Sequence, residues 1–152
     1  MKLWMIFVVC TILCWGAYVP TLHNGQKAFN DNNSALRAFL FVGLAYLLVA
    51  LAVLAYMVVT KAEPMVFTAK GANLSTIAGI LGALGALGIV FALKNQGKPL
   101  FVAPLVFAGA PIVNTFVSMA WHKPSSPPKI WFYVGILLAA AGAALALRFK
   151  PN

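Results

Sequence analysis

The stretch LRAFLFVGLAYLLVALAVLAYMVVT, residues 36–60, contains one charged residue, Arg37, close to its start. A helix needs about 20 mostly apolar residues to cross roughly 30 Å of hydrocarbon, so this stretch predicts a transmembrane helix. Four more apolar stretches lie on either side of it, at residues 3–20, 74–93, 99–121 and 130–147. We therefore expect an all-α integral membrane protein with five transmembrane helices and with its termini on opposite sides of the membrane.

The composition excludes an ordinary soluble protein. Hydrophobic residues make up 62% of the 152 residues, whereas soluble domains are about 45–50% apolar. The net charge of +9 comes from cations that stand singly or in pairs at the ends of the apolar stretches, where they meet lipid headgroups. No basic stripe carries interleaved aromatic residues, so we expect a lipid bilayer and no nucleic acid as partner. One transmembrane domain, residues 1–152, is expected, in a cell membrane such as the bacterial inner membrane.

Neither a metal site nor a cleaved leader is expected in the first apolar stretch. Cys10 and Cys14 are one helical turn apart, a spacing that seldom gives disulfide geometry and offers too few ligands for a metal. Lys2 and the apolar residues after it resemble the start of a signal peptide, but no small-x-small cleavage site follows. We interpret the stretch as a retained helix without a cofactor.

The connections have ordinary turn chemistry. Residues 21–35 are expected to form a polar connection, with Ser34 as the N-cap of the next helix. Asn73 is a second candidate cap, and Pro99 stands at a position suited to a first helical turn. No connection is long enough for an extramembrane domain, so we expect function within the bilayer or at a partner surface.

The Lys and Arg residues give no preferred orientation. One side of the membrane would hold Lys2, Lys61, Lys70, Lys123 and Lys129. The other side would hold Lys27, Arg37, Lys94, Lys98, Arg148 and Lys150. Membrane proteins are normally oriented by a clear excess of cations on the cytoplasmic side. A balance of five against six is compatible with insertion both ways round, and such a chain can pair with an inverted copy of itself.

Small residues recur in the third and fifth stretches. Gly79, Gly82, Gly85 and Gly88 lie in the third stretch, and Gly135 and Gly142 lie in the fifth. Small residues about one turn apart allow helix backbones to approach closely in lipid. Packing within the chain explains these patterns about as well as dimerisation does.

Polar residues within the apolar stretches are uncharged. Proton-coupled carriers usually have an intramembrane carboxylate or histidine, whereas His23 and His122 lie outside the expected spans here. We therefore expect no enzyme with familiar acid–base residues. Asn114 and Ser118 lie one turn apart, about one turn after Pro111, whose ring frees a backbone carbonyl. This strip is either a hydrogen-bonding wall for a polar solute or a means of holding helices together.

Three features of the sequence resemble a known transporter family. The run ALKNQGKPLFVAPLVFAGAP, residues 92–111, resembles the junction of the third and fourth helices in the EamA-type repeat of the drug/metabolite transporter superfamily. The run CWGAYVP, residues 14–20, is similar to the opening of that superfamily and looks closest to its sugar-uptake branch. The seven-residue spacing of Gly135 and Gly142 resembles the last helix of each repeat.

The resemblance implies a five-helix half of an inverted-repeat transporter, whose first four helices surround a central substrate cavity. Carried over by position, the substrate-binding residues would be Trp15, Tyr18, Tyr46, Asn114 and Ser118. Tyr46 is supported by no motif. The chain departs from the family at residues 122–129, where many repeats have an acidic turn, and it lacks the membrane glutamate of the small multidrug-resistance branch. Both departures argue against drug/proton antiport and leave the substrate open.

Three hypotheses follow. The first is a carrier for a small polar or amphipathic metabolite, built from an antiparallel homodimer. The second is a half-transporter that needs a different membrane chain. The third is an accessory subunit that transports nothing and docks on a larger membrane complex. A stable homodimer would favour the first hypothesis, and purification only with another complex would favour the third.

Overall fold

The computed structural model describes residues 2–29, 34–122 and 124–149 and contains five α-helices within them. They are α1 (Leu3–Ala28), α2 (Ser34–Thr60), α3 (Ala69–Lys94), α4 (Pro99–Trp121) and α5 (Ile130–Arg148). All five are long and apolar enough to cross a membrane. The predicted all-α architecture with five membrane helices is confirmed. Lys123 and Lys150, which enter the charge comparison, lie outside the described residues.

Helix α1 continues past the predicted end at residue 20, so the expectation of a connection over residues 21–35 was wrong for its first part. Pro20 lies inside the helix, where it removes one backbone donor and crowds the preceding turn. Tertiary contacts hold the following turns: Leu22 is 7% exposed and Gln26 is 6% exposed. The Gln26 side-chain amide also donates a hydrogen bond of 3.2 Å to the carbonyl oxygen of Val90 in α3.

Two other helix starts differ from the prediction. The N-cap of α3 is Thr68, whose hydroxyl oxygen accepts a hydrogen bond of 3.2 Å from the backbone N–H of Gly71. Asn73 therefore lies within the helix, which begins about one turn earlier than expected. Ser34 is the first residue of α2 and not the residue before it. Pro99 is in the first turn of α4, as predicted.

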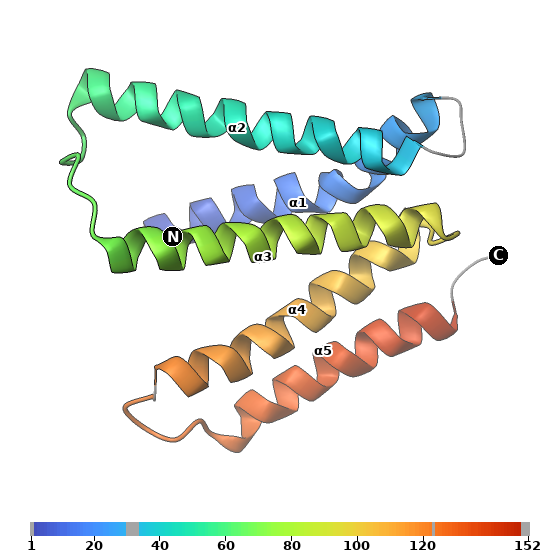
Figure 1. Ribbon diagram of the computed structural model, residues 1–152. Helices are drawn as coiled ribbons and strands as arrows, with labels where there is room; N and C mark the ends of the chain where they lie inside the picture. Colours follow the sequence, from blue (N-terminus) through green and yellow to red (C-terminus); the bar gives the residue numbers. More distant parts are fainter. Residues whose placement is uncertain (1, 30–33, 123, 150–152) are drawn as a thin grey trace. The chain divides into compact units, whose positions relative to one another are not determined.

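The chain divides into two compact units. The first unit comprises Met1–Pro20 and Gly97–Asn152, and the second comprises Thr21–Gln96. The chain passes between them within α1, after Pro20, and in the turn between α3 and α4, where Gln96 has a φ of 67°. In the first unit α4 packs against α5, and in the second α2 packs against α3 (Figure 1).

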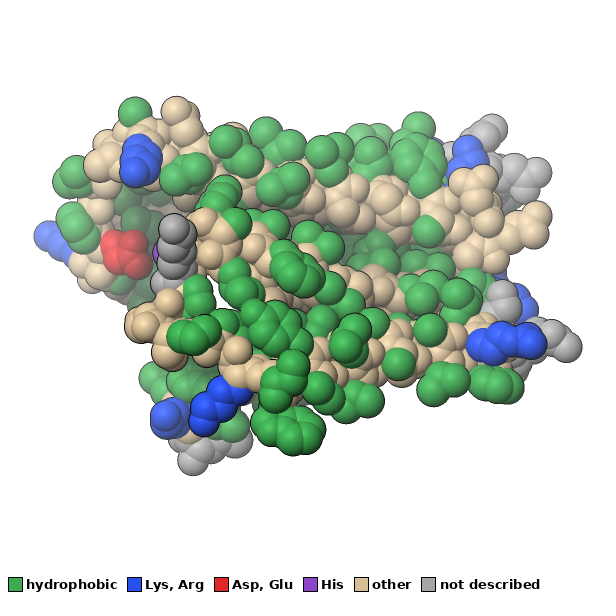
Figure 2. Space-filling model, turned by 90° about the horizontal axis from the view of Figure 1, so that it is seen from below, with side chains coloured by type: hydrophobic (Ala, Val, Ile, Leu, Met, Phe, Trp, Pro, Cys, Tyr) green, Lys and Arg blue, Asp and Glu red, His purple; other side chains and the backbone are tan. Residues whose placement is uncertain are grey.

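Buried apolar side chains are concentrated near one end of the second unit. They include Leu22 of α1, Ala35 and Ala38 of α2, and Val90 and Leu93 of α3. Along the rest of the helices most large apolar side chains are exposed. Figure 2 shows them along the helix lengths, with Lys and Arg gathered at the ends. Such surfaces are suited to contact with lipid or with other membrane helices.

Candidate functional site

One side of α4 carries the polar strip that the sequence suggested. Phe107, Pro111, Asn114 and Ser118 are separated by four, three and four residues. Residues at these spacings lie above one another on a helix. We call these four residues the α4 face.

Pro111 makes the backbone of this face more polar. A proline has no N–H, so the carbonyl of Phe107 lacks its usual donor four residues later. The carbonyl of Pro111 itself is occupied, because the Thr115 hydroxyl donates a hydrogen bond of 2.9 Å to it. The α4 face therefore presents a backbone acceptor one turn before Pro111, in addition to the Asn114 amide and the Ser118 hydroxyl.

Trp15 of α1 contacts the α4 face within the first unit. Its ring centroid lies 5.9 Å from that of Phe107, with an interplanar angle of 54°. Tilted aromatic pairs at this separation are attractive. Tyr18, about one turn further along α1, is half-buried, and its hydroxyl oxygen is buried. The structure thus joins Trp15 to the same face of α4 that carries Asn114 and Ser118.

Asn114 and Ser118 themselves are exposed, and neither side chain makes a hydrogen bond to a described residue. Helix α4 has 23 residues, so Asn114 lies about 6 Å beyond its midpoint at a rise of 1.5 Å per residue. That depth is within the hydrocarbon of a bilayer. An amide without a partner in an apolar medium costs roughly 2–7 kcal/mol, so Asn114 needs water, a solute or another protein group.

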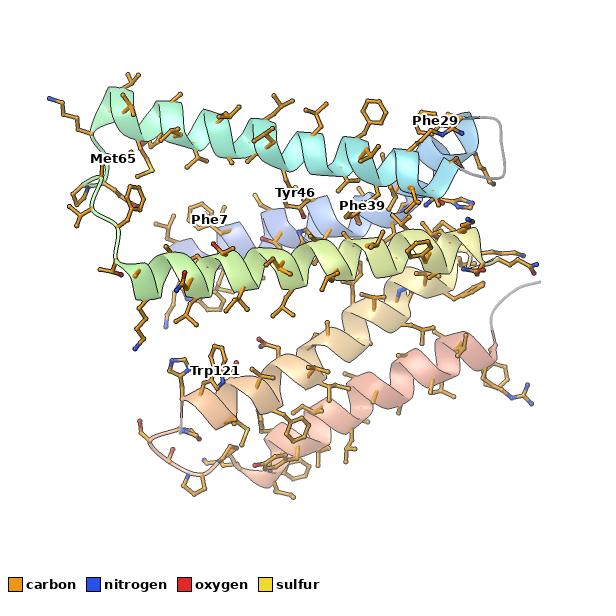
Figure 3. The ribbon with its side chains drawn as sticks, viewed as in Figure 1. Phe7, Phe29, Phe39, Tyr46, Met65 and Trp121 are labelled. Atoms are coloured by element: carbon orange, nitrogen blue, oxygen red, sulfur yellow. The ribbon has the colours of Figure 1, made fainter. Side chains whose placement is uncertain are left out.

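Tyr46 belongs to the other compact unit. It lies in the middle of α2 in the second unit and is 61% exposed (Figure 3). Within the first unit the structure brings Trp15 to the α4 face. The role of all five residues in substrate binding stays a prediction.

The sequence analysis missed two recesses. An apolar groove of about 380 Å³ lies between α4 and α5, where Phe107, Pro111 and Thr115 face Trp131 and Phe132. A smaller polar recess lies at one end of the second unit, lined in part by His23, Gln26 and Lys27. The spacing of those three residues, i, i+3 and i+4, is the signal of a shared helix face. It was overlooked because they lie in a segment interpreted as a connection.

Comparison with models of protein families, with curated protein sequences and with solved structures found no match to this chain.

Proposed function

We propose that two copies of this chain pair in the membrane and carry a small, uncharged polar or amphipathic metabolite across it, with the α4 face lining the route. The observation that carries this proposal is the exposed amide of Asn114, which has no hydrogen-bond partner among the described residues. Lipid tails offer the amide nothing to bind, whereas a hydrated route or a second chain does.

The chemistry of the face supports an uncharged solute. An asparagine amide offers two donors and one acceptor oxygen, and the Ser118 hydroxyl both donates and accepts. The indole of Trp15 adds an aromatic surface beside Phe107, against which a sugar-like ring can stack. Charged side chains are absent from α4 along its whole length, Pro99–Trp121, so the face provides no counter-ion for a charged substrate.

The open glycines of α3 support pairing between chains. No neighbouring atom lies within 4 Å of the position that a Cβ would occupy at Gly79, Gly82, Gly85 or Gly88. Glycine lets helix backbones approach closely, but no other helix in the described part of the chain packs against these four glycines. A helix of a second chain could pack closely against them.

The balance of cations supports an inverted second copy. With five Lys or Arg residues against six, neither orientation is favoured, and two inverted copies would together form the paired repeats typical of many transporters. The resemblance of residues 92–111 to the drug/metabolite transporter superfamily points in the same direction. We place the carrier in the cell membrane, such as the bacterial inner membrane.

Transport is tested with a mixture of solutes, because the chemistry of the α4 face is compatible with many uncharged substrates. Proteoliposomes containing the purified chain are loaded with the small-molecule fraction of a cell extract, and the solutes that leave are identified by mass spectrometry. We expect the wild type to release particular solutes and Asn114→Leu, which keeps the side-chain volume, to retain them. Val113→Ala, a change at the neighbouring exposed position, is the matched control and should behave as the wild type.

The same variants address the alternative of an accessory subunit. That role predicts no selective release by the wild-type chain. It also predicts that Asn114→Leu weakens assembly with a larger complex, or changes nothing. Size-exclusion profiles of the wild type and of Asn114→Leu distinguish a transport defect from an assembly defect.

A further inference from the structure

The loop that joins α2 to α3, residues 61–68, carries three consecutive exposed apolar side chains. Met65 is 46% exposed, Val66 is 79% exposed and Phe67 is 74% exposed. Figure 3 labels Met65 on this loop. Single apolar side chains are common on protein surfaces, but an exposed run of them is unfavourable in water and usually has a function. We call these three residues the apolar trio.

The connections after α3 and α4 lack such a run. Residues 95–98 read NQGK, and residues 122–129 read HKPSSPPK, in which proline is the only apolar residue. The hydrophobic composition of the chain therefore does not by itself make its loops apolar. The trio is a particular feature of the loop between α2 and α3.

Hydrogen bonds of the backbone define the conformation of this loop. Lys61 has a φ of 52°, and its N–H donates a bond of 2.9 Å to the Met57 carbonyl, which ends α2. The Val66 N–H donates a bond of 2.8 Å to the Pro64 carbonyl and closes a three-residue turn. Thr68 caps the first turn of α3. The trio is thus presented by a loop that is fixed at both ends and in its middle.

The same turn lowers the cost of placing the loop among lipids. A backbone N–H without a partner is costly in an apolar medium. Pro64 has no N–H, and the N–H of Val66 is already bonded within the loop. The centre of the loop therefore offers apolar side chains with fewer backbone donors that need water.

Helix length places the loop at the level of the lipid headgroups. Helices α2 and α3 have 27 and 26 residues, so each is about 40 Å long at a rise of 1.5 Å per residue. A bilayer is about 40–45 Å thick with its headgroups, and its hydrocarbon core is about 30 Å thick. A loop that joins two such spanning helices lies in the headgroup layer, within reach of the acyl chains.

The charges on either side of the trio fit this layer. Lys61 precedes the trio and Lys70 follows it, and Glu63 is the one acidic residue in the segment 61–70. Lysines at this level are attracted to lipid phosphates. Large apolar side chains next to them can reach the boundary between headgroups and acyl chains.

We propose that the apolar trio inserts into the boundary between headgroups and acyl chains and holds the α2–α3 loop against the membrane. Lys61 and Lys70 lie at the phosphates on either side of it. The partner of this surface is the lipid of the surrounding bilayer. The inference goes beyond the proposed transport and does not depend on it.

The experiment uses the full chain in lipid vesicles, with an environment-sensitive fluorescent label on a single cysteine. Cys10→Ala and Cys14→Ala provide the background. Ala62→Cys places the label at an exposed loop position and leaves the trio unchanged. Ser125→Cys, also exposed, is the matched control in the connection between α4 and α5, on the same side of the membrane if all five helices cross it. Iodide on both sides of the vesicles quenches a label in water, and nitroxide-labelled lipids quench a label among acyl chains.

We expect the label at position 62 to be quenched by the nitroxide lipids and several-fold less by iodide than the label at position 125. Replacement of the whole trio (Met65→Ser, Val66→Ser and Phe67→Ser) should raise iodide quenching at position 62 to the level at position 125, because polar side chains do not enter the boundary. Position 125 should not respond. Circular dichroism should show an unchanged helix content, since the trio is exposed and lies outside the helices.

Three results would overturn the proposal. The first is equal iodide quenching at positions 62 and 125 with the trio intact, a comparison that needs no change to the trio. The second is unchanged protection of position 62 after the serine replacements. The third is protection that disappears when each vesicle holds one chain, which would assign the trio to a second copy. Transport by the chain, or its absence, affects none of these results.

Discussion

The indole ring of Trp15 and the phenyl ring of Phe107 lie 5.9 Å apart, centroid to centroid. Trp15 is in α1 and Phe107 is in α4. The contact therefore joins the first membrane helix to the fourth. Lipid gives helices no hydrophobic reason to associate, and specific packing of this kind must stabilise the pair. The contact also holds Trp15 beside the polar α4 face.

The Trp15–Phe107 pair should show a measurable coupling energy. Trp15→Ala and Phe107→Ala should each destabilise the folded chain, and the double variant should be less destabilised than the sum of the two. We expect a coupling of about 0.5–1.5 kcal/mol, the range of aromatic pairs. Denaturant unfolding in detergent, followed by circular dichroism, measures it. Strict additivity of the two single changes would show that the rings do not interact.

The hydrogen bond between Gln26 and Val90 should stabilise the second unit. Gln26→Leu keeps a similar volume but removes the donor of the 3.2 Å bond, and we expect a loss of about 0.5–1.5 kcal/mol of unfolding free energy. Gln96→Leu is the control, because Gln96 is exposed in the turn after α3. The same unfolding assay compares them. A cost for Gln26→Leu no larger than for Gln96→Leu would mean that the bond does not hold the end of α1.

The sequence predicted the helices well and their ends less well, for a physical reason. Apolar length alone defines a membrane helix, whereas the ends depend on local polar contacts. The turns after Pro20 are polar, and they are helical because Leu22 and Gln26 are buried within the second unit. Similarly, Thr68 rather than Asn73 caps α3 through its bond to Gly71. One sequence does not reveal such tertiary partners.

The candidate site was predictable only in part. The shared face of Pro111, Asn114 and Ser118 follows directly from helical spacing. The contact of Trp15 with that face does not, because spacing within one helix carries no information about which other helix it meets. The polar recess of the second unit was missed because Lys94, Ser34 and His23 line it together only through the packing of three helices.

The glycines of α3 should matter for pairing and not for the fold of one chain. Gly82→Leu places a large side chain where no neighbouring atom lies within 4 Å, so the chain should still fold while close approach of a second helix is blocked. We expect the homodimer fraction, measured by chemical cross-linking in membranes, to fall, because close contact between small residues is what holds such helices together in lipid. Gly43→Leu on α2, at a position equally open, is the control. An unchanged dimer in Gly82→Leu would exclude α3 from the interface.

The orientation of the chain should respond to a few added charges. Because five cations face six across the membrane, we expect both orientations in the native population, with the two termini of each molecule on opposite sides. Two or three Lys residues added to the connection between α2 and α3 should drive the population to one orientation. Reporter fusions at each terminus, active on one side only, measure the proportions. A single orientation of the unmodified chain would remove the main support for an antiparallel pair.

Water access to position 114 tests the central claim most directly. In a background without native thiols (Cys10→Ala and Cys14→Ala, both exposed free cysteines), Asn114→Cys and Val113→Cys are labelled in sealed vesicles with a membrane-impermeant maleimide. Val113 is 64% exposed and lies about 100° away around the helix at nearly the same depth, so it serves as the lipid-facing control. We expect rapid labelling at position 114 and about a tenfold slower reaction at position 113, because a thiol surrounded by lipid rarely ionises and reacts. Equal resistance of both positions to the reagent would contradict a hydrated route along the α4 face.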